Sequence, residues 1–225
     1  TDGDVFVIGG LGPLTGAAAS YGISVKQGAE VAIDEINAAG GVQVGDKTYT
    51  LALNFADDEA SEDKVITAYN SLMDSGINAL LGCVTSGACL AVIDQTQADG
   101  ILQITPSGSA AGCTEYDNAF RLCFTDPLQG VTLADYVTDT LGLTKVAIIY
   151  NNADEYSTGI TDAFVEEAEA KKNAEAEEAS DDGADAALET EKAEGSSTVN
   201  GFDADLGAML DNVDNLSVTK ESAYT

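Results

Sequence analysis

Apolar and polar positions follow two different rhythms along the chain. Short runs rich in Val, Ile, Leu and Phe predict strands buried on both faces, because such strands need no polar side. These runs occupy residues 4–10, 48–55, 78–84, 101–106, 119–124 and 145–152. Longer segments with apolar residues at helical spacing predict helices at residues 20–37, 62–73, 86–98, 130–141 and 157–170.

Strand and helix alternate regularly from the start of the chain to about residue 170. Parallel neighbouring strands can be joined only by a long crossover, which is usually a helix. The alternation therefore predicts a doubly wound α/β fold, with a parallel sheet covered by helices on both faces. We expect residues 1–124 to form a first α/β lobe and residues 125–170 to begin a second, incomplete lobe.

The composition changes after residue 170. Residues 171–225 are rich in Ala, Glu, Asp and Ser, and carry fourteen acidic against four basic side chains. Low hydrophobicity with like charges is typical of a solvated helix or of a disordered segment. We expect an acidic low-complexity tail here, helical in part and without a strand.

The whole chain is strongly acidic, with 39 Asp and Glu against 9 Lys and Arg and a formal net charge of −30. Such a molecule repels phosphate backbones and anionic lipids, which argues against nucleic acid as a partner. No uncharged apolar stretch is long enough to span a membrane. No signal peptide opens the chain either, so we expect any such segment to have been removed before Thr1.

The chain has no histidine. It therefore lacks the usual general base, the commonest metal ligand and every triad that contains histidine. No Ser-Lys, Cys or paired-carboxylate arrangement replaces them in the sequence. We expect a protein that is not an enzyme and that needs no cofactor.

Four cysteines, Cys83, Cys89, Cys113 and Cys123, match neither a zinc motif nor a C-x-x-C redox pair. They are either disulfide-bonded or buried thiols. Their even number favours disulfides if the protein is secreted, and three pairings are then possible. Of these, Cys113 with Cys123 is preferred because the two flank a turn-rich stretch.

Two further motifs have simple structural explanations. The glycine-rich IGGLGPLTG lacks the order of a phosphate-binding loop, and its glycines suit a tight strand-to-helix connection. The cluster Asp57, Asp58 and Glu59 lacks a calcium-loop pattern and is interpreted as a solvated loop. We expect no metal.

The opening IGGLGPLTGAAASYGISVKQGAEVAIDEINAAGGV resembles the leucine/isoleucine/valine-binding proteins of ABC transporters. The DD after the second strand, ILQITPSGSA and VAIIYNNADEYSTG agree with that family in order and spacing. The resemblance covers residues 4 to about 170. It implies a type I periplasmic binding fold, in which two lobes close on an amino acid.

The resemblance also implies a set of ligand-binding residues. Ser86, the backbone at Ser107 and the hydroxyl of Ser109 match positions that hold the ligand α-carboxylate. Independently of the family, Ser86 follows a strand and starts a helix, where its hydroxyl can cap the helix or donate to an anion. Tyr21 and Tyr156 match tyrosines that wall the ligand from either lobe. Family members are longer, and no residue after 170 matches the acid that meets the ligand ammonium.

The resulting hypothesis is an extracytoplasmic receptor that binds a small amino acid of the branched-chain type and delivers it to an ABC transporter permease. The resemblance implies a periplasmic or cell-surface location, with or without a lipid anchor added before processing. Two alternatives remain open. One is a sensor domain of the same fold for an amide or peptide, and the other is a truncated remnant that binds nothing.

Overall fold

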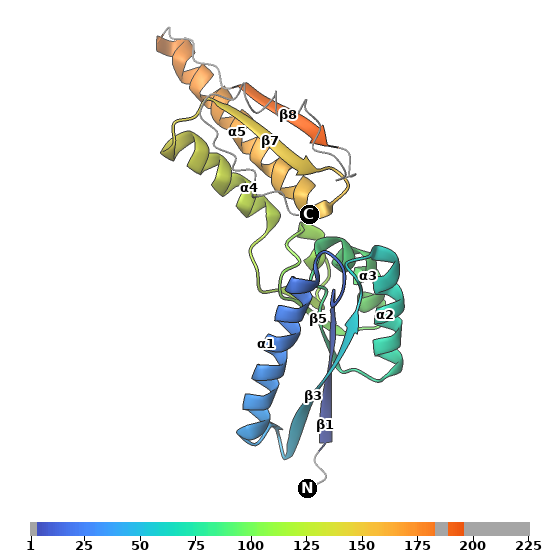
Figure 1. The fold of residues 1–225 in the computed structure, drawn as a ribbon. Helices are drawn as coiled ribbons and strands as arrows, with labels where there is room; N and C mark the ends of the chain where they lie inside the picture. Colours follow the sequence, from blue (N-terminus) through green and yellow to red (C-terminus); the bar gives the residue numbers. More distant parts are fainter. Residues whose placement is uncertain (1–3, 183–188, 196–225) are drawn as a thin grey trace. The chain divides into compact units, whose positions relative to one another are not determined.

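The computed structural model describes residues 4–182 and 189–195, with side chains as far as residue 174. The chain divides into two compact units, Thr1–Thr125 and Asp126–Thr225. Each unit contains helices packed on strands (Figure 1) and has its own cluster of buried apolar side chains.

A six-stranded sheet forms the centre of the first unit, in the order β2-β3-β1-β4-β5-β6. Its strands are β1 (Asp4–Gly12), β2 (Val42–Val44), β3 (Lys47–Asp57), β4 (Ala79–Gly82), β5 (Leu102–Thr105) and β6 (Ala119–Arg121). All neighbouring strands are parallel except β2 and β3, which pair antiparallel. The predicted doubly wound α/β fold is confirmed, and β2 is an addition that the sequence pattern did not reveal.

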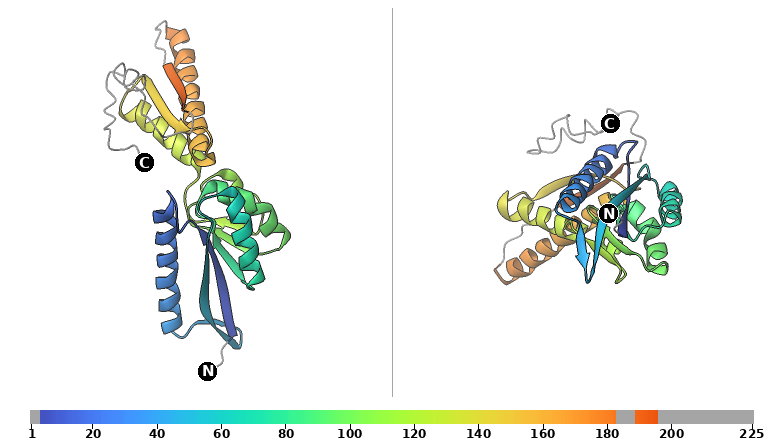
Figure 2. Two further views of the ribbon diagram at one scale, coloured as in Figure 1. Left: turned by 45° about the vertical axis from the view of Figure 1, so that its right-hand side comes forward. Right: turned by 90° about the horizontal axis from the view of Figure 1, so that it is seen from below.

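Three helices cover the two faces of this sheet. They are α1 (Ala19–Ala38), α2 (Glu62–Asp74) and α3 (Ser86–Ala98). The chain leaves β1 through α1 toward β3, and α2 then carries it back past β1 to β4. Because crossovers are right-handed, this reversal places α1 on one face and α2 and α3 on the other. Figures 1 and 2 show this arrangement.

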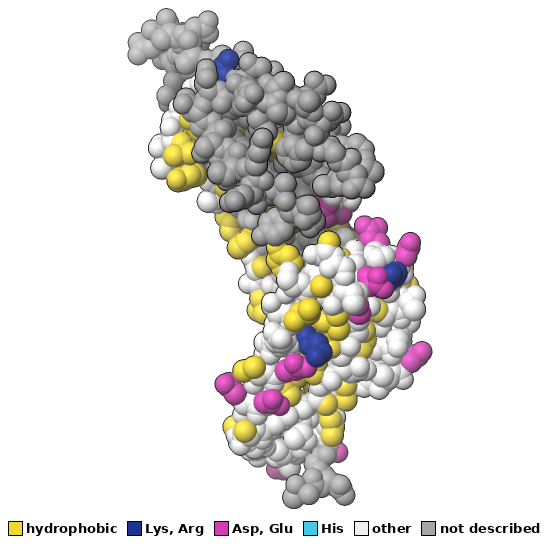
Figure 3. Space-filling model, in the orientation of Figure 1, with side chains coloured by type: hydrophobic (Ala, Val, Ile, Leu, Met, Phe, Trp, Pro, Cys, Tyr) yellow, Lys and Arg dark blue, Asp and Glu magenta, His cyan; other side chains and the backbone are white. Residues whose placement is uncertain are grey.

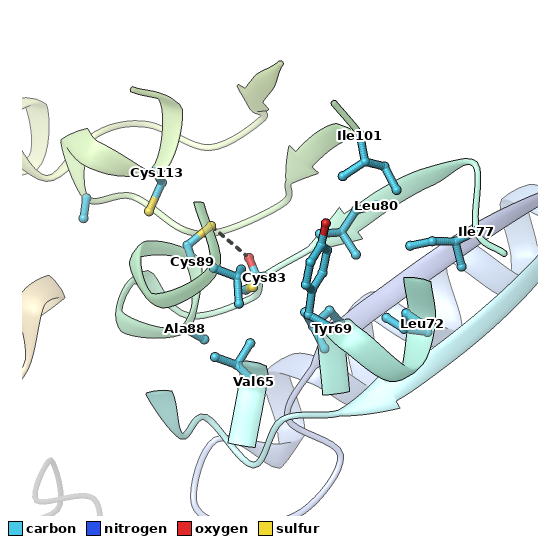
Figure 4. Close-up of a cluster of buried hydrophobic side chains, with 13 residues drawn as sticks. Val65, Tyr69, Leu72, Ile77, Leu80, Cys83, Ala88, Cys89, Ile101 and Cys113 are labelled. Carbon is cyan, nitrogen blue, oxygen red and sulfur yellow. Dashed lines mark hydrogen bonds between the residues drawn. The ribbon is translucent and has the colours of Figure 1, made fainter. Parts of the chain in front are cut away.

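The main core lies between the sheet and the helices α2 and α3 (Figure 4). Tyr69 is its largest fully buried side chain, and its hydroxyl donates a 2.8 Å hydrogen bond to Asp99 Oδ2. That bond satisfies the polar end of the ring, which would otherwise lose its hydrogen bond to water. The other fully buried large apolar side chains here are Leu11, Val65, Leu72, Leu80 and Val92.

The start of α1 packs tightly on the loop that follows β1. A Cβ atom at Gly22 would lie 1.9 Å from the carbonyl oxygen of Pro13, so only glycine permits this approach. Along the rest of α1, only Ile33 is buried. The helix is therefore held close to the end of β1 at its first turns.

The second unit is built from two helices and a pair of strands. Its elements are α4 (Asp126–Asp135), a π-helical stretch η2 (Tyr136–Thr140), β7 (Lys145–Asn151), α5 (Glu155–Asp182) and β8 (Glu189–Gly195). The helices α4 and α5 pack closely at Gly130, where a Cβ atom would lie 2.6 Å from the Ile160 carbonyl oxygen. Phe164 and Ala168 of α5 and Ala134 of α4 form the buried cluster of this unit.

The prediction that no strand follows residue 170 is wrong. The strand β8 pairs in parallel with the whole length of β7, and α5 continues twelve residues beyond the predicted helix end at 170. The segment ETEKAEG has a weak strand propensity, and its pairing with β7 overrides that preference. Residues 183–188 and 196–225 of the predicted acidic tail lie outside the described residues.

None of the described helices is long and apolar enough to cross a bilayer.

Candidate functional site

The connections of the first sheet diverge between β1 and β4. From β1 the chain moves to β3 on one side, and from β4 it moves to β5 on the other. Open α/β sheets bind ligands at such a point, outside the carboxyl ends of the strands. The segments that follow β1, β4 and β5 therefore define the candidate site.

Helix α3 begins just after β4 and presents its amino end to this site. Thr85 is the N-cap residue, but its side chain makes no capping hydrogen bond. The first intrahelical bond runs from the N–H of Cys89 to the carbonyl oxygen of Thr85. The N–H groups of Ser86, Gly87 and Ala88 precede that bond, so they have no acceptor within the helix. This helix end carries partial positive charge and suits an anion.

Ser86 and Ser109 lie side by side at the amino end of α3. The Ser86 hydroxyl accepts hydrogen bonds from the backbone N–H groups of Ser109 and Ala110, both at 3.2 Å. Its own proton remains available for donation. The Ser109 side chain is only 2% exposed, and its hydroxyl has no hydrogen-bond partner among the described residues.

Ser107 lies in the same loop after β5, but its hydroxyl is bonded within the protein. That hydroxyl donates to the carbonyl oxygen of Val84 and thereby joins the loop to the segment before α3. The structure thus brings together the three predicted serines. The Ser107 hydroxyl is used in a hydrogen bond within the protein, which agrees with a ligand role for its backbone alone. The hydroxyls of Ser86 and Ser109 donate no hydrogen bond to another described residue.

Arg121 holds the loop that carries Ser109, a function that the sequence analysis missed. Its guanidinium donates to the carbonyl oxygens of Ser109 and Ala110 at 2.8 Å each and to that of Gly108 at 3.3 Å. It also donates to Thr114 Oγ1 at 2.7 Å. Arg121 is the only arginine in the chain and is the last residue of the short strand β6, and its place in an otherwise apolar run is the signal that could have revealed it.

Tyr21 lies in the first turn of α1 and is 64% exposed. The contact of Gly22 with Pro13 places this turn beside the loop after β1, at the same edge of the sheet as the serines. Nothing in the structure joins Tyr21 to Ser86 by a hydrogen bond.

Tyr156 belongs to the second unit and lies in the first turn of α5. It is 42% exposed, and its hydroxyl donates to Gln129 Oε1 at 3.4 Å. The proposed ligand contacts of Tyr21 and Tyr156 stay predictions.

The interpretation of the acidic cluster as a solvated loop is wrong for Asp58, which is completely buried. Burial raises the pKa of Asp58 to about 6, although the N–H of Ala60 donates to its Oδ1 at 2.8 Å. Asp57 behaves oppositely. Despite partial burial, hydrogen bonds from the Thr15 hydroxyl and the Leu14 N–H lower its pKa. Asp57 therefore ties the loop after β1 to the end of β3.

Three of the four cysteines are buried next to the candidate site (Figure 4). All four are present as thiols, so the disulfides expected from the sequence stay a prediction. Cys113 donates to the carbonyl oxygen of Ser86 at 3.9 Å, and Cys89 donates to that of Cys83 at 4.0 Å. These side chains form the support directly behind Ser86.

An apolar groove of about 460 Å³ lies at the opposite end of the sheet. It is lined by the first residues of β1 and β3 together with Val42, Val44 and Asn78. Because it faces away from the carboxyl ends of the strands, it is not the candidate site.

Comparisons with known proteins identify the family of the chain. A family model described as periplasmic binding protein matches residues 6–179. The chain is 38% identical over 159 residues to the Leu/Ile/Val-binding protein homolog 3 of Brucella melitensis, a match that covers 70% of this chain and 42% of that protein. The chain thus spans less than half the length of this relative.

Solved structures give the same picture. A branched-chain amino acid transporter substrate binding protein from Streptococcus pneumoniae, in complex with isoleucine, superposes with a TM-score of 0.75 and 25% identity. The match covers 92% of this chain and 54% of that one. A leucine binding protein from Thermotoga maritima gives a TM-score of 0.73 at 21% identity, with coverage of 92% and 53%.

Proposed function

The chain belongs to the periplasmic binding protein family, and on that premise we propose that it acts in an extracytoplasmic solute-binding protein for a branched-chain amino acid. The protein captures the amino acid between two lobes and delivers it to the permease of an ABC transporter. It carries out no chemical reaction on this ligand. Its place is the periplasm or the cell surface, with or without a lipid anchor added before processing.

The observation that carries this proposal is the pairing of Ser109 with the amino end of α3. The Ser109 hydroxyl is buried and has no hydrogen-bond partner among the described residues. The backbone nitrogen of Ser109 lies 3.2 Å from the hydroxyl oxygen of Ser86. An unsatisfied buried hydroxyl costs free energy, which a ligand acceptor offsets. A carboxylate there accepts from both serine hydroxyls and from the N–H groups that open the helix.

Many ligands carry a carboxylate. The similarity to a Leu/Ile/Val-binding protein homolog favours an α-amino acid as the ligand of this chain. In this proposal Tyr21 and Tyr156 contact the side chain of the ligand, since aromatic rings supply apolar area with little loss of conformational entropy. The acid that meets the ligand ammonium is not assigned to any described residue.

Isothermal titration calorimetry of the 225-residue chain with leucine, isoleucine and valine tests the proposal. Leucinamide, which lacks the carboxylate, is the matched ligand. We expect the amino acids to bind and leucinamide to bind at least about tenfold more weakly, because it loses charge-assisted hydrogen bonds. Equal binding of the amide would instead favour the amide sensor.

Two variants locate the site. Ser86→Ala and Ser109→Ala each remove one donor to the carboxylate, and we expect each to weaken leucine binding by about ten- to a hundredfold. Ser71→Ala, on the exposed side of α2, is the control and should leave the affinity unchanged. Binding that survives both site substitutions would show that the ligand lies elsewhere.

A further inference from the structure

We propose that Cys89 and Cys113 form a disulfide bond behind Ser86, which links the first turn of α3 to the 3-10 turn η1 (Ala111–Thr114). The proposal rests on the proposed function only for its compartment, since an extracytoplasmic location supplies the oxidant. The pairing itself follows from the packing of the first unit.

The two sulfur atoms flank the same glycine. A Cβ atom built on Gly108 would lie 3.3 Å from Cys89 Sγ and 3.3 Å from Cys113 Sγ. Both cysteines have an exposed fraction of 0%. Figure 4 shows Cys113 and Cys89 on neighbouring elements, with the Cys89 sulfur turned toward the carbonyl oxygen of Cys83. Since Gly108 has no side chain, both sulfurs can lie against it, together with the Thr105 hydroxyl, whose oxygen would lie 2.7 Å from the same Cβ position.

The electrostatic surroundings single out Cys89 as the reactive thiol. A hydrogen bond from the Cys113 thiol, and then one from the Cys83 thiol, lower the pKa of Cys89. The amide of Gln103 also donates to Cys89 Sγ at 3.4 Å. Burial, by contrast, raises the pKa of Cys83. Cys89 therefore becomes a thiolate more readily than Cys83, and the thiolate is the nucleophile in disulfide exchange.

Cys83 and Cys123 are the competing partners. Cys83 lies just after β4, and its raised pKa makes it a poor nucleophile. The largest effect on the pKa of Cys89 comes from Cys113 and not from Cys83. A metal does not explain the cluster, because the described part of the chain contains no group of three or more suitable side chains arranged to hold one.

The reaction is an exchange with a disulfide oxidant, either a small-molecule disulfide or a protein that carries one. Both sulfurs are buried once the unit has folded, so the exchange takes place while the chain folds. The Cys89 thiolate attacks the oxidant, forms a mixed disulfide and releases one thiol. The Cys113 thiolate then attacks the Cys89 sulfur and releases the second thiol. The cysteines lose two electrons and two protons in total, and the oxidant gains both.

The bond would fix the two segments that form the candidate site. Cys113 already donates to the carbonyl oxygen of Ser86, and Ser86 accepts from Ser109 and Ala110. Oxidation would remove the S–H group with which Cys113 donates to Ser86 and would add a covalent link behind the same cluster. The hydrogen bonds that Ser86 accepts would remain. We expect it to raise the melting temperature without a need for ligand.

Peptide mapping tests the pairing on the unmodified sequence. The full chain is unfolded and reduced, refolded with reduced and oxidised glutathione, alkylated at its remaining thiols under denaturing conditions, and cleaved before aspartate. This cleavage puts Cys83 and Cys89 on peptide 74–93, Cys113 on 99–116 and Cys123 on 117–125. We expect 74–93 to be joined to 99–116, with the loss of two alkylated thiols and their return after reduction.

Other products would overturn the proposal. A link between 99–116 and 117–125 would show the Cys113–Cys123 pair, an unlinked 74–93 two hydrogens lighter would show Cys83–Cys89, and four alkylated thiols would show no bond. Cys83→Ala should retain the link and Cys89→Ala should abolish it; the reverse would assign the bond to Cys83. None of these results depends on ligand binding, so a failed disulfide and a failed receptor function remain distinguishable.

Discussion

The backbone N–H of Ser109 donates to the hydroxyl of Ser86 across 3.2 Å, which joins the loop after β5 to the first residue of α3. Segments that lie 23 residues apart in the chain therefore share one hydroxyl. The candidate site depends on this contact, because it fixes the spacing of the two serines.

Ser86→Ala should lower the free energy of unfolding as well as ligand affinity. The substitution leaves the N–H groups of Ser109 and Ala110 buried without their acceptor, at a cost of about 1–3 kcal/mol. Urea unfolding without ligand measures the effect. A loss no larger than that of Ser71→Ala would show that the hydroxyl does not hold the loop.

Arg121→Lys should destabilise the first unit by about 2 kcal/mol or more, although the charge is kept. A single ammonium cannot reproduce the planar set of donors that meets Ser109, Ala110 and Thr114 together. Chemical denaturation measures the difference. Lys26→Arg, in an exposed i,i+4 ion pair with Glu30, is the control and should change stability by less than about 0.5 kcal/mol.

Two glycine substitutions in the same helix should act in opposite directions. Gly22→Ala forces a Cβ atom onto the backbone of Pro13 and should cost roughly 3 kcal/mol of stability. Gly28→Ala meets no atom within 4 Å and should stabilise the helix by up to about 1 kcal/mol. Thermal unfolding compares the two. A tolerated Gly22→Ala would contradict the close packing of α1 on the loop after β1.

The buried carboxyl of Asp58 should make stability fall as pH rises from about 4 to about 6. Its folded pKa of about 6 lies above the ordinary value of 3.8, so the folded state holds the proton more tightly. Protonation therefore stabilises the fold at low pH, and this contribution is lost as pH rises through 6. The difference corresponds to about 3 kcal/mol.

Asp58→Asn isolates that effect. The free energy of unfolding of the wild type minus that of the variant should fall by up to about 3 kcal/mol between pH 4 and pH 7. Asp46→Asn, at an exposed position, controls for the loss of one negative charge. A pH-independent difference for Asp58→Asn would mean that the carboxyl titrates normally.

Salt should stabilise the protein. Acidic side chains are scattered over the described surface of the first unit (Figure 3), and the whole chain carries a formal charge of −30. Their mutual repulsion is screened over about 10 Å at 0.1 M salt and about 3 Å at 1 M. The melting temperature should rise between these concentrations, equally in sodium and choline chloride. A rise with sodium alone would point to specific cation binding instead of screening.

Most of the strands and helices could be predicted from the sequence, because the strands are apolar and the helices between them are clearly separated. Residues 48–55 and 145–152, for example, correspond to β3 and β7. The pattern failed for β2 and β8. The first has only three residues, and the second has polar residues whose strand state depends on pairing with β7. Local propensity contains no information about such a partner.

The candidate site could be predicted less completely. Ser86 was identifiable because it follows a strand and starts a helix, and the family resemblance added Ser107 and Ser109. The burial of Asp58 was not foreseen, since adjacent carboxylates usually remain solvated. The approach of Cys89 to Cys113 depends on the folding of the intervening β5 and its loop, which no sequence spacing encodes.

The contacts of Arg121 also bear on how selectivity could be changed. The acceptors contributed by Gly108, Ser109 and Ala110 are main-chain carbonyl groups, which every amino acid possesses. These acceptors are therefore retained when small side chains at residues 109–111 are exchanged for others that fit the same space. A library randomised at residues 109–111, with the arginine retained, offers a way to evolve recognition of new solutes on an unchanged frame.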